Sequence, residues 1–98
     1  MIIIEKVLCA AIWVDDGKTN YLYQPKNIKS GFVISGWRHG SILEFMKAKK
    51  VSNKGSMQGF ITSDNRFLDR VEARELVIKT GQLEDTAWND ELYSEDLY

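Results

Sequence analysis

The chain has 98 residues, of which 44% are hydrophobic, and 13 basic and 14 acidic side chains give it a net charge of −1. This length and apolar content predict one folded domain, residues 1–98, and exclude a disordered chain. A general DNA or RNA binder is also excluded, because such proteins need an excess of positive charge.

The first 35 residues predict three strands. Residues 2–14 are rich in Ile, Val and Ala and predict the first strand. Asp15 to Lys18 predict a turn, and Tyr21 to Tyr23 the second arm of a hairpin that Pro25 ends. Phe32 to Ser35 predict the third strand.

The same region excludes a signal peptide, a membrane span and a cysteine-based site. The apolar start is interrupted by Glu5 and Lys6, with no basic segment before it. No stretch approaches the roughly 18 apolar residues that span a membrane. Cys9 is the single cysteine, expected to be a small buried hydrophobe in a strand. These features favour a reducing, cytoplasmic location.

A first helix is predicted from about Ser41 to Lys50. The segment 36–40 forms a glycine-bounded corner after the third strand. Ser41 is a favourable N-cap, and Glu44 three residues later completes a capping box. An apolar stripe at helical spacing follows, which favours packing of this helix on the sheet.

A second helix is predicted from about Asp69 to Thr80, after a strand from Gln58 to Thr62 and a turn at 63–65. Asp69 and Glu72 form its capping box, and Gly81 is a typical residue to end it. The resulting fold class is α+β, a small antiparallel sheet with two short helices.

Residues 82–98 form an acidic, aromatic C-terminal arm. Apolar side chains continue to its last residue, so we expect the arm to dock on the domain or on a neighbouring subunit rather than to stay solvated. The anchors are Leu83, Trp88, Leu92, Tyr93, Leu97 and Tyr98.

The sequence offers no recognisable catalytic set. One histidine, one cysteine and scattered serines form no nucleophile–base pair at a known spacing. There is no His- or Cys-rich metal pattern and no phosphate-binding glycine fingerprint. We therefore expect a protein that is not an enzyme and that needs no cofactor.

The corner before the first helix is the first candidate ligand site. Helix N-termini present unpaired N–H groups that favour anions. Arg38 would grip a phosphate, and Trp37 would stack on a base, with His39 beside them. The alternative is structural: Trp37 in the core, Arg38 paired with a carboxylate of the arm, and His39 bound to a loop carbonyl.

The second candidate site surrounds the second helix start. Arg66 and Arg70 would bind an anion, Asn65 would contact a base or ribose, and Phe60 lies nearby in the sequence. The alternative, favoured here, is that both arginines balance neighbouring carboxylates. Two such corners on a chain without net positive charge favour a compact anionic ligand over a polyanion.

Three motifs together resemble a family of small bacteriophage proteins, the anti-Thoeris sponges (the first type of Thoeris anti-defence protein). They are SGWRHGSI at 35–42, QGFITSDNRFLDRVEARELVIKTGQL at 58–83 and ELYSEDLY at 91–98. Gly40 departs from the family pattern, in which we expect a polar residue, so the ligand preference is open.

The resemblance implies an antiparallel sheet with two helices, assembled as homo-oligomers in the host cytoplasm. It implies sequestration, without hydrolysis, of cyclic ADP-ribose isomers and, in some members, cyclic oligonucleotides. The residues within the matched motifs are Arg38, His39, Phe60, Asn65, Arg66 and Arg70. Two other hypotheses stay open: a phage inhibitor that docks its C-terminal arm on a host enzyme, and a nucleotide-processing enzyme with His39 as base.

Overall fold

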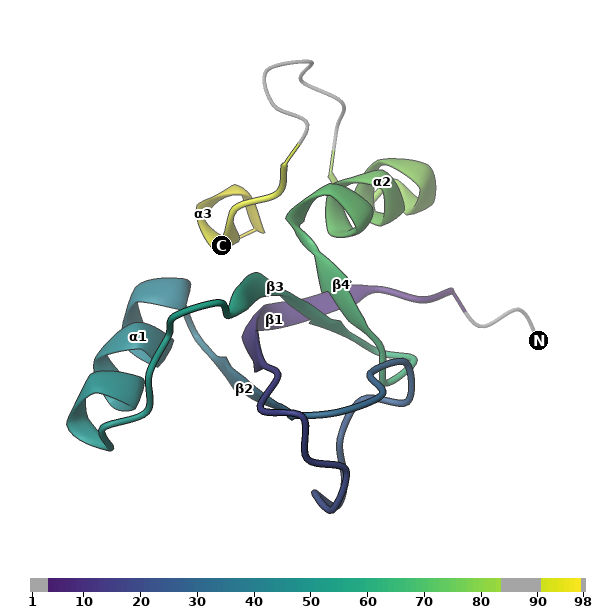
Figure 1. The fold of residues 1–98 in the computed structure, drawn as a ribbon. Coiled ribbons are helices and arrows are strands. Elements are labelled where there is room, and N and C mark those ends of the chain that lie inside the picture. Colours follow the sequence, from purple (N-terminus) through teal and green to yellow (C-terminus); the bar gives the residue numbers. More distant parts are fainter. Residues whose placement is uncertain (1–3, 84–90, 98) are drawn as a thin grey trace.

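The computed structural model describes residues 4–83 and 91–97. Their architecture is α+β, as predicted, with a four-stranded antiparallel sheet and two main helices (Figure 1). The elements are β1 (Val7–Val14), β2 (Phe32–Gly36), α1 (His39–Ala48), β3 (Met57–Thr62), β4 (Phe67–Asp69), α2 (Arg70–Thr80) and the one-turn α3 (Ser94–Leu97).

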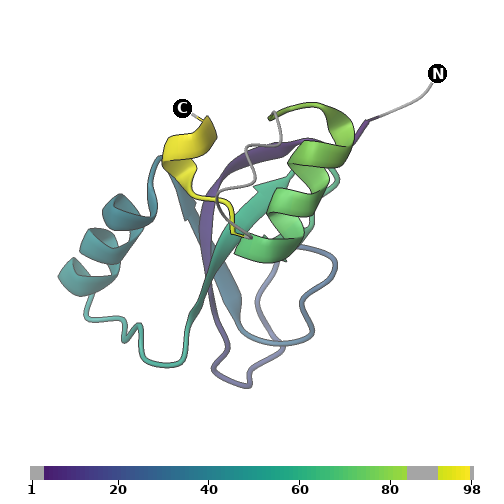
Figure 2. The ribbon, with the colours of Figure 1, turned by 90° about the horizontal axis from the view of Figure 1, so that it is seen from above.

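The sheet has the strand order β2-β1-β3-β4, so β1 lies inside it and β2 and β4 form its edges. Side chains alternate between the two faces of a strand. Ala10 and Ile12 of β1 and Phe60 of β3 are fully buried on the face that carries the helices. Figure 2 shows α1 and α2 at the two sides of this face, with α3 between them. The core therefore lies between one sheet face and the helices.

Two aromatic rings cover part of the opposite face. Trp13 of β1 and Phe67 of β4 lie with their ring centroids 6.1 Å apart. The ring of Phe67 lies over Gly59, where an added Cβ would approach its Cζ to 2.7 Å. Gly59 therefore gives this ring the space to lie flat against the middle of the sheet.

The predicted hairpin is wrong. β1 pairs with Phe32–Gly36, and Tyr21 to Tyr23 lie in a long loop between the two strands. Tyr23 has a left-handed backbone with φ of 60°, which is incompatible with an extended strand. Local hydrogen bonds replace strand pairing in this loop, among them one from Gly31 N–H to the Lys18 carbonyl at 2.8 Å. The first strand also begins at Val7 rather than at residue 2, and residues 1–3 lie outside the described part.

Helix α1 begins two residues before the predicted position. Arg38 is its N-cap, and Ser41 occupies the third helical position. The Ser41 hydroxyl accepts a hydrogen bond from the Arg38 N–H at 3.1 Å and donates to the Arg38 carbonyl at 2.7 Å. Ser41 therefore binds the backbone of the N-cap residue from the third helical position. The predicted capping box of Ser41 and Glu44 is wrong. The helix ends at Ala48, before the predicted Lys50.

The prediction for α2 is confirmed. The Asp69 carboxylate accepts from the Glu72 N–H at 2.8 Å, and the Glu72 carboxylate accepts from the Asp69 N–H at 3.1 Å. Gly81 ends the helix in the left-handed conformation with φ of 78°. Ala73 and Val77 are the buried residues of this helix.

The described parts of the C-terminal arm, residues 82–83 and 91–97, pack on their own chain, and Leu83 lies against the core. Leu92 is fully buried in the core, and its N–H donates to the Arg70 carbonyl at 2.9 Å. Trp88 and Tyr98, two other predicted anchors, lie outside the described residues. No helix within the described ranges is long and apolar enough to cross a membrane.

Candidate functional site

The seven residues predicted to bind a ligand lie in three places. One group surrounds the start of α1, a second lies at the β3–β4 turn, and Arg70 stands at the start of α2. Arg66 and Arg70 flank β4 at its opposite ends, so they do not share a site.

Two residues of the first group are structural. The His39 ring is 7% exposed, and its Nε2 lies 2.7 Å from the Gly59 carbonyl oxygen. Since a carbonyl only accepts hydrogen bonds, this nitrogen donates. The ring also meets Phe60 edge to face, with centroids 5.1 Å apart. Phe60 is completely buried in the core. This geometry agrees with the structural alternative for His39 and removes Phe60 as a ligand contact.

Trp37 and Arg38 occupy the same corner, where Trp37 is exposed and Arg38 is half-buried, with its Nη1 atom buried. Trp37 is 66% exposed, so it is not a core residue. The Arg38 guanidinium lies 5.5 Å from the centroid of the Trp37 ring, a cation–π arrangement. This pair leaves an aromatic surface open beside the start of α1.

The residues of the β3–β4 turn serve the fold. Arg66 binds Glu5 through two hydrogen bonds, and the Thr62 hydroxyl donates to the same carboxylate at 2.5 Å. Asn65 has a φ of 56° in the turn, and its carbonyl accepts from the Lys26 N–H at 2.9 Å. The favoured structural reading of Arg66 therefore holds, although its partner is Glu5 rather than a neighbouring carboxylate.

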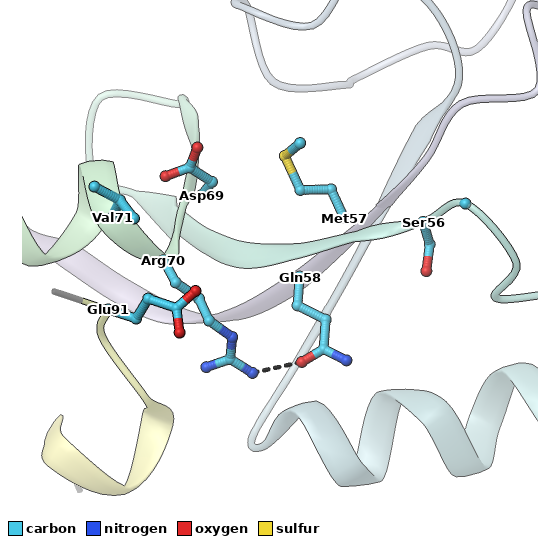
Figure 3. A pocket seen from close by; sticks show the side chains of 8 residues that line it. Ser56, Met57, Gln58, Asp69, Arg70, Val71 and Glu91 are labelled. Atoms are coloured by element: carbon cyan, nitrogen blue, oxygen red, sulfur yellow. Dashed lines mark hydrogen bonds between the residues drawn. The ribbon is translucent and has the colours of Figure 1, made fainter. Parts of the chain in front are cut away.

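Arg70 differs because it lies beside an open pocket of about 400 Å³ (Figure 3). Its guanidinium donates to the Leu92 carbonyl at 2.9 Å and to the Gln58 side-chain oxygen. It also lies 4.5 Å from the centroid of the Tyr93 ring. The pocket is lined by residues 55–58 at the start of β3, residues 69–71 at the start of α2, and Glu91.

Strand β3 connects the start of α1 with this pocket, because two of its adjacent residues contact the two places. His39 contacts the carbonyl of Gly59, and Arg70 contacts the side chain of the preceding residue, Gln58. A guanidinium and an amide that line a pocket are suited to phosphate and base recognition, and the Tyr93 ring beside the guanidinium lies outside the lining. The pocket volume lies within the range of small-molecule sites.

Two acidic side chains in the pocket already have partners. Asp69 caps α2 through the Glu72 N–H, and Glu91 accepts a hydrogen bond from the Tyr93 hydroxyl at 3.1 Å. Both donors are neutral, so the two carboxylates keep their negative charge, which an anionic ligand would meet beside Arg70.

Sequence reasoning missed Gln58 and Tyr93. Tyr93 belongs to the terminal motif ELYSEDLY, but nothing in the sequence placed that motif against the start of α2. The signal that could have found it is the apolar residue before it: Leu92 must be buried, which fixes the position of its neighbour.

Among the described residues, the pocket shows no nucleophilic side chain paired with a base. The Ser56 hydroxyl donates to the Asn53 carbonyl at 2.7 Å, and His39 binds the sheet backbone. Within residues 4–83 and 91–97, no three His, Cys, Asp or Glu side chains gather to hold a metal ion.

A comparison with protein families matches residues 6–98 to the family described as phage T4 y16D protein. The match includes both candidate corners, β1 to β4 and the C-terminal arm. No curated protein and no solved structure matches the chain.

Proposed function

This chain belongs to the phage T4 y16D protein family and is a phage protein, and we propose that it binds and sequesters a small nucleotide signal without cleaving it. The observation that supports this function best is the pocket at Arg70. A guanidinium and a polar amide line this cavity of about 400 Å³, and the Tyr93 ring, outside the lining, lies 4.5 Å from the same guanidinium.

Each component has a physical role in the proposed binding. Arg70 neutralises a phosphate or diphosphate through its charge and through the guanidinium N–H groups that are not bonded to Leu92 and Gln58. The Tyr93 ring, 38% exposed, offers a face on which a base stacks. Gln58 supplies an amide oxygen and nitrogen for a base edge or ribose hydroxyl.

Sequestration fits this pocket better than turnover. A sponge needs tight binding of the ground state and no group aimed at a transition state. The ligand class follows the resemblance to anti-Thoeris sponges: cyclic ADP-ribose isomers first, and cyclic oligonucleotides second. The place of action is then the cytoplasm of the infected cell, where such immune signals are made.

The test is a thermal-shift and calorimetry panel on the purified chain. The panel contains cyclic ADP-ribose isomers, cyclic di- and trinucleotides, ADP-ribose and single-stranded DNA. A ligand at about 1,000 times its dissociation constant adds roughly 4 kcal/mol of stability, which raises the melting temperature clearly. Ligand released by denaturation is then compared by mass with the starting compound, and an unchanged mass supports sequestration.

Two matched arginine variants locate the site. Arg70→Lys keeps the charge but loses the fork, and we expect it to weaken binding by about tenfold or more, because a hydrogen bond to a charged group contributes roughly 1.5–3 kcal/mol. Arg66→Lys makes the same change at the Glu5 pair and is expected to leave binding unchanged. A loss of binding in Arg66→Lys alone would place the ligand elsewhere.

Tyr93→Ala tests the aromatic contact. Removing a stacked ring costs about 1–3 kcal/mol of binding, or roughly 5- to 150-fold in affinity. Trp37→Ala is its control, because the Trp37 ring lies at the other corner. If Trp37→Ala weakens binding and Tyr93→Ala does not, the first corner is the site.

A flat panel would overturn the nucleotide proposal and favour the second hypothesis, a phage protein that inhibits a host enzyme through the C-terminal arm. In that case deletion of residues 90–98 removes the inhibitory effect. The burial of Leu92 argues against a free arm, because residue 92 is part of the core of its own chain.

A further inference from the structure

Side-chain amides occupy backbone groups along the open sides of the sheet. β2 and β4 are its edges, and β1 extends beyond the end of β2, which pairs with residues 10–14 of β1. On each of these three strands, an outward-facing backbone N–H donates to the side-chain oxygen of a glutamine or asparagine. The pairs are Val33 of β2 with Gln24, Phe67 of β4 with Asn27, and Val7 of β1 with Gln82.

On β4 the amide takes the place of a neighbouring strand. The Phe67 N–H donates to the Asn27 side-chain oxygen at 2.7 Å, and the Asn27 side-chain nitrogen donates to the Phe67 carbonyl at 2.6 Å. A residue of an adjacent antiparallel strand would make the same two bonds. The next outward N–H, that of Asp69, donates to the Glu72 carboxylate at 3.1 Å. Both outward N–H groups of this three-residue strand are therefore occupied.

β1 shows the same arrangement where β2 no longer covers it. The Val7 N–H donates to the Gln82 side-chain oxygen at 3.0 Å, and the Gln82 side-chain nitrogen donates to the Val7 carbonyl at 2.8 Å. The carbonyl of the preceding residue, Lys6, accepts from the Ser63 N–H just after β3 at 2.8 Å. Because successive residues of a strand bond in opposite directions, Val7 faces away from β3, on the side that β2 leaves open.

The stability that these bonds add is modest, because Asn27 and Gln82 are exposed. Water would bond to the same backbone groups if the amides were absent, so only a small net gain remains. What the amides change is the access of another chain. A strand edge with vacant N–H and C=O groups is a template for a further strand, and a strand that adds here must first displace an amide.

We propose that Asn27 and Gln82, with Gln24 on β2, block the open sides of the sheet against strands from other chains. A side-chain amide suits this role because it carries a donor and an acceptor, as a peptide group does. It has no backbone beyond it, so it ends the sheet instead of extending it. Strand addition relies on main-chain hydrogen bonds, so the block acts on extended peptides and on unfolded chains of any sequence.

Blocked edges favour a protein that stays dispersed at high concentration. Sequestration needs this property, because each bound signal molecule uses up one site. That consequence rests on the proposed function, whereas the block itself does not. None of the three amides lines the pocket at Arg70. A flat nucleotide panel would therefore leave the block intact, and a failure of the block would leave the nucleotide site intact.

Four chains test the block on β4, by sedimentation velocity and thioflavin T fluorescence without nucleotide. They are the natural chain, Asn27→Val, Asn27→Lys, and Asn27→Val combined with Asn53→Lys. Both single variants lose the amide, but the lysine places a charge at the edge, which itself disfavours strand addition. The double variant has the same net charge as Asn27→Lys, with the added lysine in the exposed loop between α1 and β3.

We expect Asn27→Val and the double variant to form larger species than the natural chain, with thioflavin T fluorescence about tenfold higher after the same incubation. Asn27→Lys should behave as the natural chain does. Gln82→Val and Gln82→Lys repeat the comparison on β1. The proposal is overturned if the valine variants stay as dispersed as the natural chain, if the lysine variants associate as readily as the valine variants, or if the double variant stays dispersed.

Discussion

Arg66 and Glu5 form an ion pair with two hydrogen bonds. Nε of Arg66 lies 2.8 Å from Oε2 of Glu5, and Nη2 lies 2.6 Å from Oε1. The pair joins the segment before β1 to the turn between β3 and β4, 61 residues apart in sequence. The guanidinium that looked suited to an anionic ligand is therefore bound to a carboxylate of its own chain.

This pair predicts a specific loss of stability in acid. The Arg66 hydrogen bonds lower the pKa of Glu5 from 4.5 to about 2. A lowered pKa means that the carboxylate stabilises the fold above pH 4.5, and that this contribution is lost as the pH falls toward 2. With Glu5 18% and Arg66 36% exposed, we expect the loss to be about 1–2 kcal/mol, between that of surface and buried pairs.

Urea unfolding between pH 5 and pH 2.5 measures this effect. Glu5→Gln should show a flatter dependence of the unfolding free energy on pH than the natural chain. Asp64→Asn is the control, because the Asp64–Lys26 pair is more than half exposed on both sides. If Glu5→Gln and the natural chain lose stability in parallel, the ion pair contributes nothing to the fold.

Gly59 is predicted to tolerate no side chain. Its added Cβ would collide with the Leu68 carbonyl and lie 2.7 Å from Cζ of Phe67. Because backbone on the adjacent strand cannot move away without breaking the sheet, we expect Gly59→Ala to cost more than about 2 kcal/mol. Gly40→Ala is the matched control: its Cβ meets nothing within 4 Å inside α1, so it should be neutral or stabilise by up to about 1 kcal/mol. Thermal unfolding of both variants compares them directly.

The elements that the sequence predicted well are those whose signals are local. The capping box of Asp69 and Glu72 and the terminal Gly81 fixed α2 to within one residue, because helix ends depend on side chains three or four positions apart. The predicted start of α1 was wrong because Ser41 is the third helical residue and binds the backbone of the N-cap residue Arg38, instead of being the N-cap itself. A serine at the third helical position has the same sequence signal as one at the N-cap.

The pairing of β1 and the candidate site could not be predicted from the sequence, because both depend on contacts between residues that are far apart in the chain. Tyr21 to Tyr23 have strand-like composition, but pairing is decided by which partner better buries its side chains. Most of Phe32–Gly36 is half-buried, whereas Tyr21 to Tyr23 are exposed. Likewise Arg66 binds Glu5, 61 residues away, and Arg70 binds Leu92 and Gln58, 22 and 12 residues away. Contacts at that separation leave no periodic pattern in one sequence.

Asn27 is predicted to stabilise the edge strand β4. Its amide accepts from the Phe67 N–H at 2.7 Å and donates to the Phe67 carbonyl at 2.6 Å, which is the pair of bonds that a neighbouring strand would make. Asn27→Asp replaces the donor by an oxygen facing that carbonyl. Asn27 itself is exposed, so we expect a loss of about 0.5–1.5 kcal/mol in urea unfolding, the usual net contribution of a hydrogen bond. Asn53→Asp, in an exposed loop, should stay within about 0.5 kcal/mol of the natural chain.

Leu92 gives the most direct measure of how firmly the C-terminal arm is part of the domain. Its side chain is fully buried among the core residues, and its backbone is bound at both ends, since the N–H donates to the Arg70 carbonyl and the carbonyl accepts from the Arg70 guanidinium. Leu92→Ala removes buried methyl groups and should cost about 2–5 kcal/mol.

The control for Leu92→Ala is Tyr93→Ala, which removes a side chain that is 38% exposed and should cost less. Because the Arg70 guanidinium is held by the Leu92 carbonyl, a loosened arm also frees the arginine of the candidate pocket. Leu92→Ala should therefore weaken nucleotide binding as well as the fold, at temperatures where the variant is still folded. If Leu92→Ala has the same unfolding free energy as the natural chain, residues 91–97 contribute nothing to the stability of the domain.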